Sequence, residues 1–180
     1  MIVEIGHFAL VMALCISAIQ ATFPLFGANT NNRAWMALGS PAALLQLLLL
    51  AIAFAALTHA FVTSDFSVIT VANNSHTLKP MLYKVSGVWG NHEGSMLMWV
   101  LILAIYGAAV AIWGNNLRPT LKARVLGIQG LLGFGFLLFI IFTSNPFGRL
   151  IPAPINGQDL NPLLQDPGLA FHPPLLYLGY

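Results

Sequence analysis

The run MALGSPAALLQLLLLAIAFAALTHAFV, residues 36–62, decides the fold because it contains no Asp, Glu, Lys or Arg. The hydrocarbon core of a bilayer is about 30 Å thick, and about 20 apolar residues in a helix are enough to cross it. This stretch is therefore predicted to be a transmembrane helix.

Three further runs of the same kind lie at about 5–26, 95–113 and 125–143. A fifth begins at about 171 and reaches Tyr180 after ten residues, which is too short to span a bilayer. The sequence predicts an all-α polytopic membrane helical bundle, a single membrane domain over residues 1–180 with four complete transmembrane helices and the start of a fifth. We interpret the chain as the front part of a longer protein, or as one piece of a split protein.

The composition supports a membrane protein and excludes several other classes. The chain is 58% hydrophobic and 7% charged, whereas about a quarter of the residues of soluble domains are charged. Its net charge of +2 comes from seven scattered Lys and Arg, which excludes a nucleic-acid-binding surface. A signal peptide would open with a basic region, but the only early charge is Glu4. The first helix is therefore expected to stay in the protein.

Basic residues predict the orientation of the bundle, because Lys and Arg favour cytoplasmic loops. The two short links carry four of them: Arg33, Arg118, Lys122 and Arg124. Those links are expected to face the cytoplasm, which places the N-terminus and the two longer segments, about 63–94 and 144–170, outside. The acidic residues and histidines fall at or near the outer ends of helices or in these outer segments: Glu4, Asp65, Glu93, Asp159, Asp166, His7, His59, His76, His92 and His172. Any chemistry is therefore expected on the outer face.

The chain has a single cysteine, Cys15, within the first predicted helix. No disulfide can form inside the chain, and there is no CxxCH motif for covalent haem attachment. The protein is therefore not itself a c-type cytochrome.

Apolar residues recur at helical spacing between the second and third predicted helices: Leu78, Met81, Leu82, Val85 and Trp89. Lys79 and Lys84 lie off this stripe, which is typical of an amphipathic helix in the membrane interface. Thr77 would be its N-cap, and Pro80 would fall in the first turn, where proline is tolerated. An ordinary loop whose apolar side rests on the bundle explains the pattern equally well, and both interpretations remain open.

Glycines crowd the fourth predicted helix in GIQGLLGFG, residues 127–135. The spacing superficially resembles a phosphate-binding loop, but no strand precedes it. Small residues are what closely packed membrane helices need, so packing is the favoured interpretation.

The third predicted helix is preceded by WGNHEG, residues 89–94. Asn91 is a good N-cap, and Glu93 in the first turn would interact favourably with the positive end of the helix dipole. On a structural interpretation these residues cap a helix in the headgroup region, beside interfacial tryptophans. On a functional interpretation Trp89, Asn91, His92 and Glu93 bind a cofactor carboxylate or its iron.

The stretch AFHPPLLYLGY, residues 170–180, contains the strongest candidate ligand. His172 precedes two prolines, which suit a first helical turn, so its imidazole is expected at the outer mouth of the fifth helix. A helix N-terminus disfavours a second proton on imidazole. A neutral imidazole offers a nitrogen lone pair to a metal. The alternative is that His172 only caps the helix.

The remaining histidines have less specific patterns. His7 and His59 lie about one turn inside their helices, where polar groups usually face the bundle interior, so they are expected to form hydrogen bonds between helices. His76 is expected to be solvated. HExxH, paired CxxC, Walker and serine-elbow motifs are absent from the sequence.

Two long motifs carry a family resemblance: GVWGNHEGSMLMWVLILAIYG (residues 87–107) and LLQDPGLAFHPPLLYLGY (residues 163–180). NSHTLKPMLYKVSG (residues 74–87) directly precedes the first of these motifs. The chain resembles, from end to end, the amino-terminal part of the CcmF family. These are the haem lyase subunits of cytochrome c-type biogenesis, within the haem-handling membrane protein family.

The resemblance implies that His172 is an outer-face axial ligand of haem iron. It implies a haem b cofactor whose site is incomplete in this chain, because the family's tryptophan-rich segment and its second outer histidine belong to later parts. The implied function is a subunit of a cytochrome c haem lyase that holds haem while the thiols of an apocytochrome CxxCH add to the vinyl groups.

Partners and location also follow from the resemblance. The implied partners are a haem chaperone, apocytochrome c, other membrane subunits of cytochrome maturation and the lipid bilayer, with no nucleic acid. The implied location is the bacterial inner membrane with a periplasmic active face, or an organellar inner membrane for a split form.

Two other functions compete with this interpretation. An ion or solute transporter also uses polar residues and helix breaks, but it predicts ionisable groups near the membrane midplane, and those of this chain lie nearer the helix ends. A structural membrane subunit would use WGNHEG and FHPP only as caps and contacts.

Overall fold

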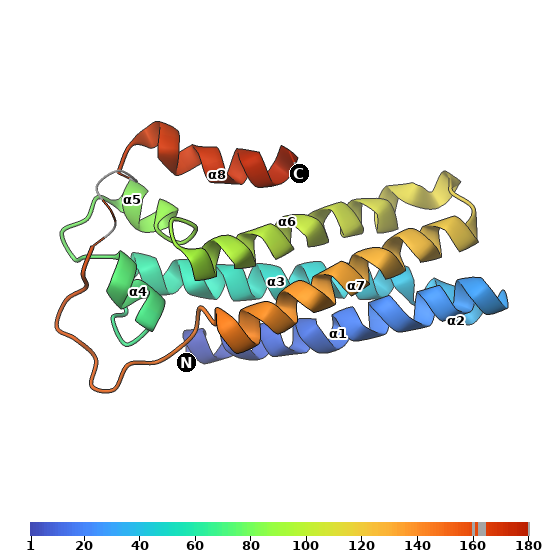
Figure 1. The fold of residues 1–180 in the computed structure, drawn as a ribbon, viewed down its shortest axis with the longest axis horizontal. Coiled ribbons are helices and arrows are strands. Elements are labelled where there is room, and N and C mark those ends of the chain that lie inside the picture. Colours follow the sequence, from blue (N-terminus) through green and yellow to red (C-terminus); the bar gives the residue numbers. More distant parts are fainter. Residues whose placement is uncertain (160, 162–164, 180) are drawn as a thin grey trace.

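The computed structural model describes residues 1–159, 161 and 165–179. Within them, four helices are long and apolar enough to cross a membrane. They are α1 (Ile2–Thr30), α3 (Gly39–Val62), α6 (His92–Trp113) and α7 (Pro119–Thr143). The four run side by side as one elongated bundle (Figure 1). The predicted all-α polytopic bundle is confirmed.

Several helix ends differ from the ends of the apolar runs. α6 begins at His92 rather than 95, since Asn91 is its N-cap, and α7 begins with Pro119 at its first turn rather than at 125. The run 36–62 is broken near Leu38, between the short helix α2 (Arg33–Ala37) and α3. The fifth helix, α8 (Pro167–Gly179), starts earlier than the predicted 171.

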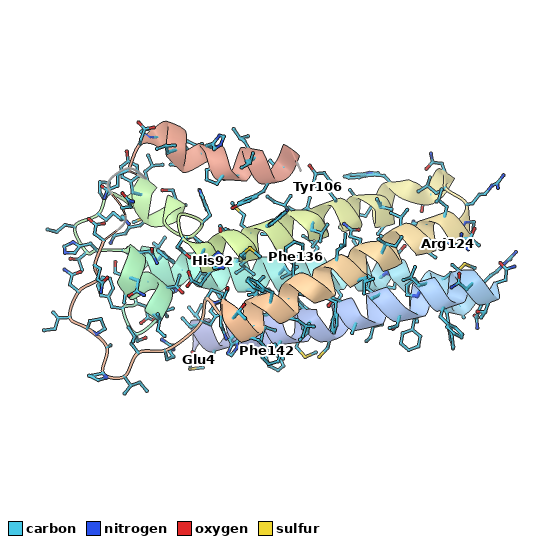
Figure 2. All side chains as sticks on the ribbon, viewed as in Figure 1. Glu4, His92, Tyr106, Arg124, Phe136 and Phe142 are labelled. Atoms are coloured by element: carbon cyan, nitrogen blue, oxygen red, sulfur yellow. The ribbon has the colours of Figure 1, made fainter. Side chains whose placement is uncertain are left out.

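The two ends of the bundle differ in chemistry (Figures 1 and 2). One end, here called the loop end, carries α4 (Ile69–Asn74), α5 (Met81–Ser86) and residues 144–159. The other, here called the basic end, carries α2 and the 3-10 turn η1 (Gly114–Asn116), with Arg33, Arg118, Lys122 and Arg124. α8 leaves the loop end and lies along α6 (Figure 1).

Leucine and alanine side chains fill the interior between α1, α3, α6 and α7. Fully buried large side chains include Leu10, Leu50, Leu57, Leu97, Leu137 and Ile140. The glycines of α7 let it approach α1. A Cβ at Gly127 would lie 2.6 Å from Leu25 Cγ, and one at Gly130 would lie 2.8 Å from the backbone nitrogen of Ala21. The packing interpretation of these two glycines is confirmed.

The segment between α3 and α6 is only partly the amphipathic helix that its spacing predicted. α5 has six residues, and Pro80, not Thr77, stands at its N-cap position. Leu78 lies outside the helix and is 87% exposed. Lys79 is buried rather than on a solvated face, because its Nζ donates to the Asn74 carbonyl at 2.7 Å and pairs with Asp159 at 3.5 Å. Burial lowers the Lys79 pKa, and the Asp159 charge partly opposes this.

Replacing glycine by alanine at two positions of α7 should have opposite effects. Gly130→Ala places a methyl group against α1 backbone and is expected to lower stability by about 1–3 kcal/mol. Gly135→Ala meets nothing within 4 Å and should raise stability by roughly 0.5–1 kcal/mol through helix propensity. Thermal unfolding of the full-length protein in detergent measures both. Equal midpoints for the two variants would contradict the close α1–α7 contact.

Candidate functional site

The start of α6 is held by Asn91, as its sequence position predicted. The Asn91 side-chain oxygen accepts a hydrogen bond from the Gly94 backbone at 2.8 Å, and its Nδ2 donates to the Gly87 carbonyl at 2.7 Å. The chain before the helix folds tightly over Gly94, where a Cβ would lie 1.6 Å from the Val88 carbonyl oxygen. The Asn91 amide is therefore used for capping, and Gly94 provides the space that the turn requires.

His92 faces α7 from the first turn of α6 (Figure 2). Its Nε2 lies 3.0 Å from the buried Ser144 hydroxyl, just after α7, and its ring meets Phe139 edge-on at 6.1 Å. Glu93 beside it is half-buried in the same first turn. The structure thus joins His92 to α7.

Ser144 and Asn145 together bind two histidines from different helices. Asn145 Nδ2 lies 3.1 Å from His7 Nε2 on α1, while Ser144 meets His92 on α6. His7 thus bonds outside its own helix, although its partner lies in the loop directly after α7 and not in a helix as expected. Sequence reasoning missed Ser144 and Asn145, although a polar pair directly after an apolar run was a visible signal. His59, which was expected to form a hydrogen bond between helices, is instead exposed in the last turn of α3, and that expectation is wrong.

His76 is not simply solvated, which corrects the expectation from sequence. Asn156 Nδ2 lies 2.9 Å from its Nε2, and the Leu78 backbone donates to its Nδ1 at 3.2 Å. The reason is that residues 144–159 return over α4, so that His76 becomes half-buried between two loop segments.

Arg149 ties the loop end together by charge. Its guanidinium bonds Glu4 at the start of α1, Ser67, and Asp65 just after α3, the last at 3.3 Å. Burial raises the Asp65 pKa, but the hydrogen bonds from Ser67 and the charge of Arg149 outweigh burial and hold that pKa below its usual range. The bond to Glu4 raises the Arg149 pKa. Residues 144–159 are thereby fastened to α1 and to the end of α3.

Trp89 binds α8 directly. Its indole Nε1 donates to the Ala170 carbonyl at 2.8 Å. In a helix that carbonyl would accept from residue 174, but residue 174 is proline, which has no N–H. The indole therefore supplies the donor that Pro174 cannot, and it joins WGNHEG to the FHPP stretch.

Two aromatic residues of α6 hold the rest of α8. Tyr106 donates its hydroxyl to the Leu178 carbonyl at 2.7 Å, and Trp99 stacks on Tyr177 with ring centroids 5.7 Å apart. Beside these contacts, a half-open cavity of about 410 Å³ lies between α6, α7 and α8. Trp99, Tyr106, Phe136 and Tyr177 line it, and Figure 2 shows Tyr106 and Phe136.

His172 lies further into its helix than the sequence predicted. Asp166 caps α8, because its Oδ1 accepts from the Gly168 and Leu169 backbones at 2.8 and 3.2 Å. His172 therefore belongs to the second turn, not the first, where the positive end of the helix dipole acts only weakly on a side chain. Its side chain is exposed.

A metal held by side chains alone does not fit the described part of the chain, where no group of three His, Cys, Asp or Glu could hold an ion. A haem iron needs only one or two axial side chains. The imidazoles of His59, His92 and His172 are exposed. His92 Nε2 already meets the Ser144 hydroxyl, and His172 is the candidate that the FHPP motif indicates.

Comparison with known proteins gives consistent matches. Residues 89–180 match the family model described as cytochrome C assembly protein, and the matched range contains both WGNHEG and FHPP. The chain is 67% identical over its whole length to the cytochrome c-type biogenesis protein ccl1 of Rhodobacter capsulatus. It is 54% and 50% identical to the cytochrome c-type biogenesis proteins CcmF of Pseudomonas aeruginosa and Escherichia coli. It spans about 28% of the length of each of these relatives.

A solved structure shows the same fold. It is described as cytochrome c heme lyase CcmF, with a TM-score of 0.87 and 23% sequence identity. The match covers 99% of this chain and 28% of that one.

Trp89→Phe is expected to loosen α8 while leaving the four-helix bundle folded. Phenylalanine keeps an aromatic side chain at this position but has no N–H for the Ala170 carbonyl. Leaving that carbonyl without a donor costs about 1–3 kcal/mol of stability. Hydrogen exchange of the α8 amides in the full-length protein should accelerate. Trp113→Phe is the matched control, since Trp113 is 76% exposed at the basic end. Unchanged α8 exchange in Trp89→Phe would refute the anchoring role.

Arg149→Gln should release residues 144–159 and alter their response to acid. Because the folded Asp65 pKa is below the unfolded value of about 3.9, its stabilisation is present above that pH and is lost as pH falls through the folded pKa. Hydrogen exchange of residues 144–159, corrected for intrinsic rates, should therefore rise at low pH. In Arg149→Gln it should already be fast at neutral pH, and an exchange profile identical to that of the parent would contradict the ionic anchor.

Proposed function

The chain belongs to the cytochrome c assembly protein family and corresponds to the amino-terminal part of CcmF, and on that premise we propose that it helps present haem to apocytochrome c. In this proposal the chain forms part of the haem lyase, and α8 carries the residue that binds the iron. The haem is a substrate that passes through the protein. The proposal extends the family's printed role in cytochrome c biogenesis to particular residues of this chain.

The exposed imidazole of His172 carries the proposal. It stands on a helix that three α6-side contacts fasten, from Trp89 to Ala170, from Trp99 to Tyr177, and from Tyr106 to Leu178. A ligand on a fastened helix holds iron at a fixed place, which favours correct attack geometry. His172 would act as one axial ligand to haem b through its free ring nitrogen.

The WGNHEG residues have supporting roles in the proposed function. Trp89 is a positioning residue, since its indole is already used on α8. Asn91 keeps the start of α6 in place. His92 and Glu93 stand at the same end of the bundle, and His92 would face the propionate or iron side of haem only by turning away from Ser144 and Phe139. We therefore assign the first contact with haem to His172.

The chemistry would take place between haem and the partner. Each thiol of the apocytochrome CxxCH adds across one haem vinyl group, forming a carbon–sulfur bond and transferring its hydrogen to the other vinyl carbon. No thiol from this chain is needed, which agrees with its single cysteine in α1. The role of His172 would be to hold the iron while both additions occur.

The haem site of this chain is proposed to be incomplete. The chain spans about 28% of its relatives' length, and a second axial ligand would come from the remainder of the protein. A haem chaperone would deliver the substrate, apocytochrome c would receive it, and other cytochrome maturation subunits would assemble with the complete protein.

The loop end is proposed to face the periplasm of a bacterial inner membrane. Four basic residues at the opposite end support this orientation, since Lys and Arg favour the cytoplasmic side. Figure 2 shows Arg124 at the basic end and Glu4 and His92 at the loop end. Haem presented by His172 would then meet apocytochrome outside the cytoplasm.

The proposal is tested with His172→Gly in the full-length protein purified with its haem chaperone. The variant should lose the haem absorbance and cytochrome maturation, and added imidazole should restore the absorbance by occupying the vacated ligand position. His59→Gly is the matched control, because His59 is also exposed near the loop end. A folded His172→Gly protein with normal absorbance and maturation would overturn the assignment and favour a structural subunit.

A further inference from the structure

Three glutamines meet inside the membrane-spanning part of the bundle, each from a different helix. Gln20 comes from α1, Gln46 from α3 and Gln129 from α7, and all three line one small cavity. Gln20 and Gln46 are 3% and 5% exposed. The side-chain oxygen of each glutamine is buried without a hydrogen-bond partner among the residues that the structure describes. Unpaired buried oxygens are rare and unfavourable, so this cluster requires an explanation.

The orientation of two of these amides is fixed by their neighbours. Gln20 Nε2 donates to the Leu126 carbonyl of α7 at 3.0 Å, and Gln129 Nε2 donates to the Leu103 carbonyl of α6. A backbone carbonyl only accepts, so each amide must present its N–H there and turn its oxygen elsewhere. The two oxygens therefore cannot be satisfied by flipping the amides.

Gln46 is free to complete the arrangement. Its side-chain amide bonds none of the residues that the structure describes, so either its oxygen or its N–H₂ group can face the cavity. Glycines provide the room around the cluster. A Cβ at Gly107 would lie 2.6 Å from Gln129 Oε1, and one at Gly133 would lie 3.8 Å from Gln46 Nε2.

The cavity has the size of one water molecule. The space for the centre of a water-sized sphere is about 10 Å³, close to what a single buried water occupies. Such a water needs two to four polar partners. We propose that this cavity is a binding site for one internal water, which donates to Gln20 Oε1 and Gln129 Oε1 and accepts from Gln46 Nε2.

A cation fits the cavity less well than water does. The residues that line it include no carboxylate: besides the three glutamines they are Ala43, Val100, Leu103, Ala104, Gly107, Gly130 and Gly133. An uncompensated charge among apolar helices would be strongly unfavourable. A water molecule, by contrast, can donate to two amide oxygens and accept from one amide N–H without adding a charge.

The bound water would join α1, α3 and α7 at one point. Each helix contributes one amide, and α6 contributes the wall and the Leu103 carbonyl. Because a hydrogen-bonded cluster is satisfied in only one helix arrangement, it would fix the rotation of the three helices relative to one another. This role is independent of haem binding at α8.

The test compares two glycine substitutions in α7 of the full-length protein. Gly133→Ala puts a methyl group at the cavity wall, where it displaces the water and orphans the amide oxygens. Gly135→Ala adds the same methyl group to the same helix with nothing within 4 Å. The thermal unfolding midpoint should rise for Gly135→Ala and stay level or fall for Gly133→Ala.

If the cavity is dry, the methyl group fills a void, and Gly133→Ala should raise the midpoint at least as much as Gly135→Ala. That result would overturn the proposal. A cryo-EM map that resolves ordered water should show one density peak among the three amides in the parent protein, and its absence would likewise overturn it. If the unfolding midpoint changes when sodium in the buffer is replaced by potassium or choline, the occupant is a cation and not water, and the proposal is wrong.

Discussion

Every backbone polar group inside hydrocarbon must find a partner within the protein, and the proline pair of α8 leaves two carbonyls that the helix itself cannot bond. Pro173 and Pro174 remove the N–H groups that would bond the carbonyls of Leu169 and Ala170. The Trp89 indole Nε1 donates to the Ala170 carbonyl at 2.8 Å in place of the missing Pro174 N–H. This bond, from the turn before α6, and the Tyr106 bond to the Leu178 carbonyl hold α8 along α6 (Figure 1).

This bond makes one structural unit of two sequence motifs. WGNHEG contributes Trp89, and AFHPP (residues 170–174) contributes both the Ala170 carbonyl and, two residues later, His172. Tyr106 and Trp99 extend the same contact along α6. A histidine on a helix held in this way has a defined position, although α8 packs on little else in the described part of the chain.

The loop end and the bundle interior follow the same pairing rule. Asn91 satisfies the first turn of α6, Ser144 and Asn145 meet two histidines, and Arg149 joins three oxygen-bearing side chains. Inside the bundle the Gln20 and Gln129 amides bond the carbonyls of neighbouring helices. Helix packing in lipid lacks a hydrophobic driving force between helices, so such polar contacts and the close approach at Gly130 select the arrangement.

Hydropathy predicted the four spans because residues 36–62 and the three other runs leave no alternative to a membrane helix. Local rules also predicted the Asn91 cap, whose partners are three and four residues away. They did not predict the burial of Lys79, the partners of His76 or the early start of α8. Lys79 pairs with Asp159, and Trp89 with Ala170, across about 80 residues of chain. Sequence spacing contains no information on such contacts. The glutamine cluster could not be predicted for the same reason, because Gln20, Gln46 and Gln129 lie far apart in the sequence.

The central claim is that His172 holds haem iron on a helix fastened by Trp89. A cryo-EM structure of the full-length protein loaded with haem by its chaperone tests it most directly. The account predicts haem density whose iron is bonded to a ring nitrogen of His172, with the Trp89 indole still on the Ala170 carbonyl. Haem bound at the loop end through other ligands, with His172 turned away from the iron, would contradict it.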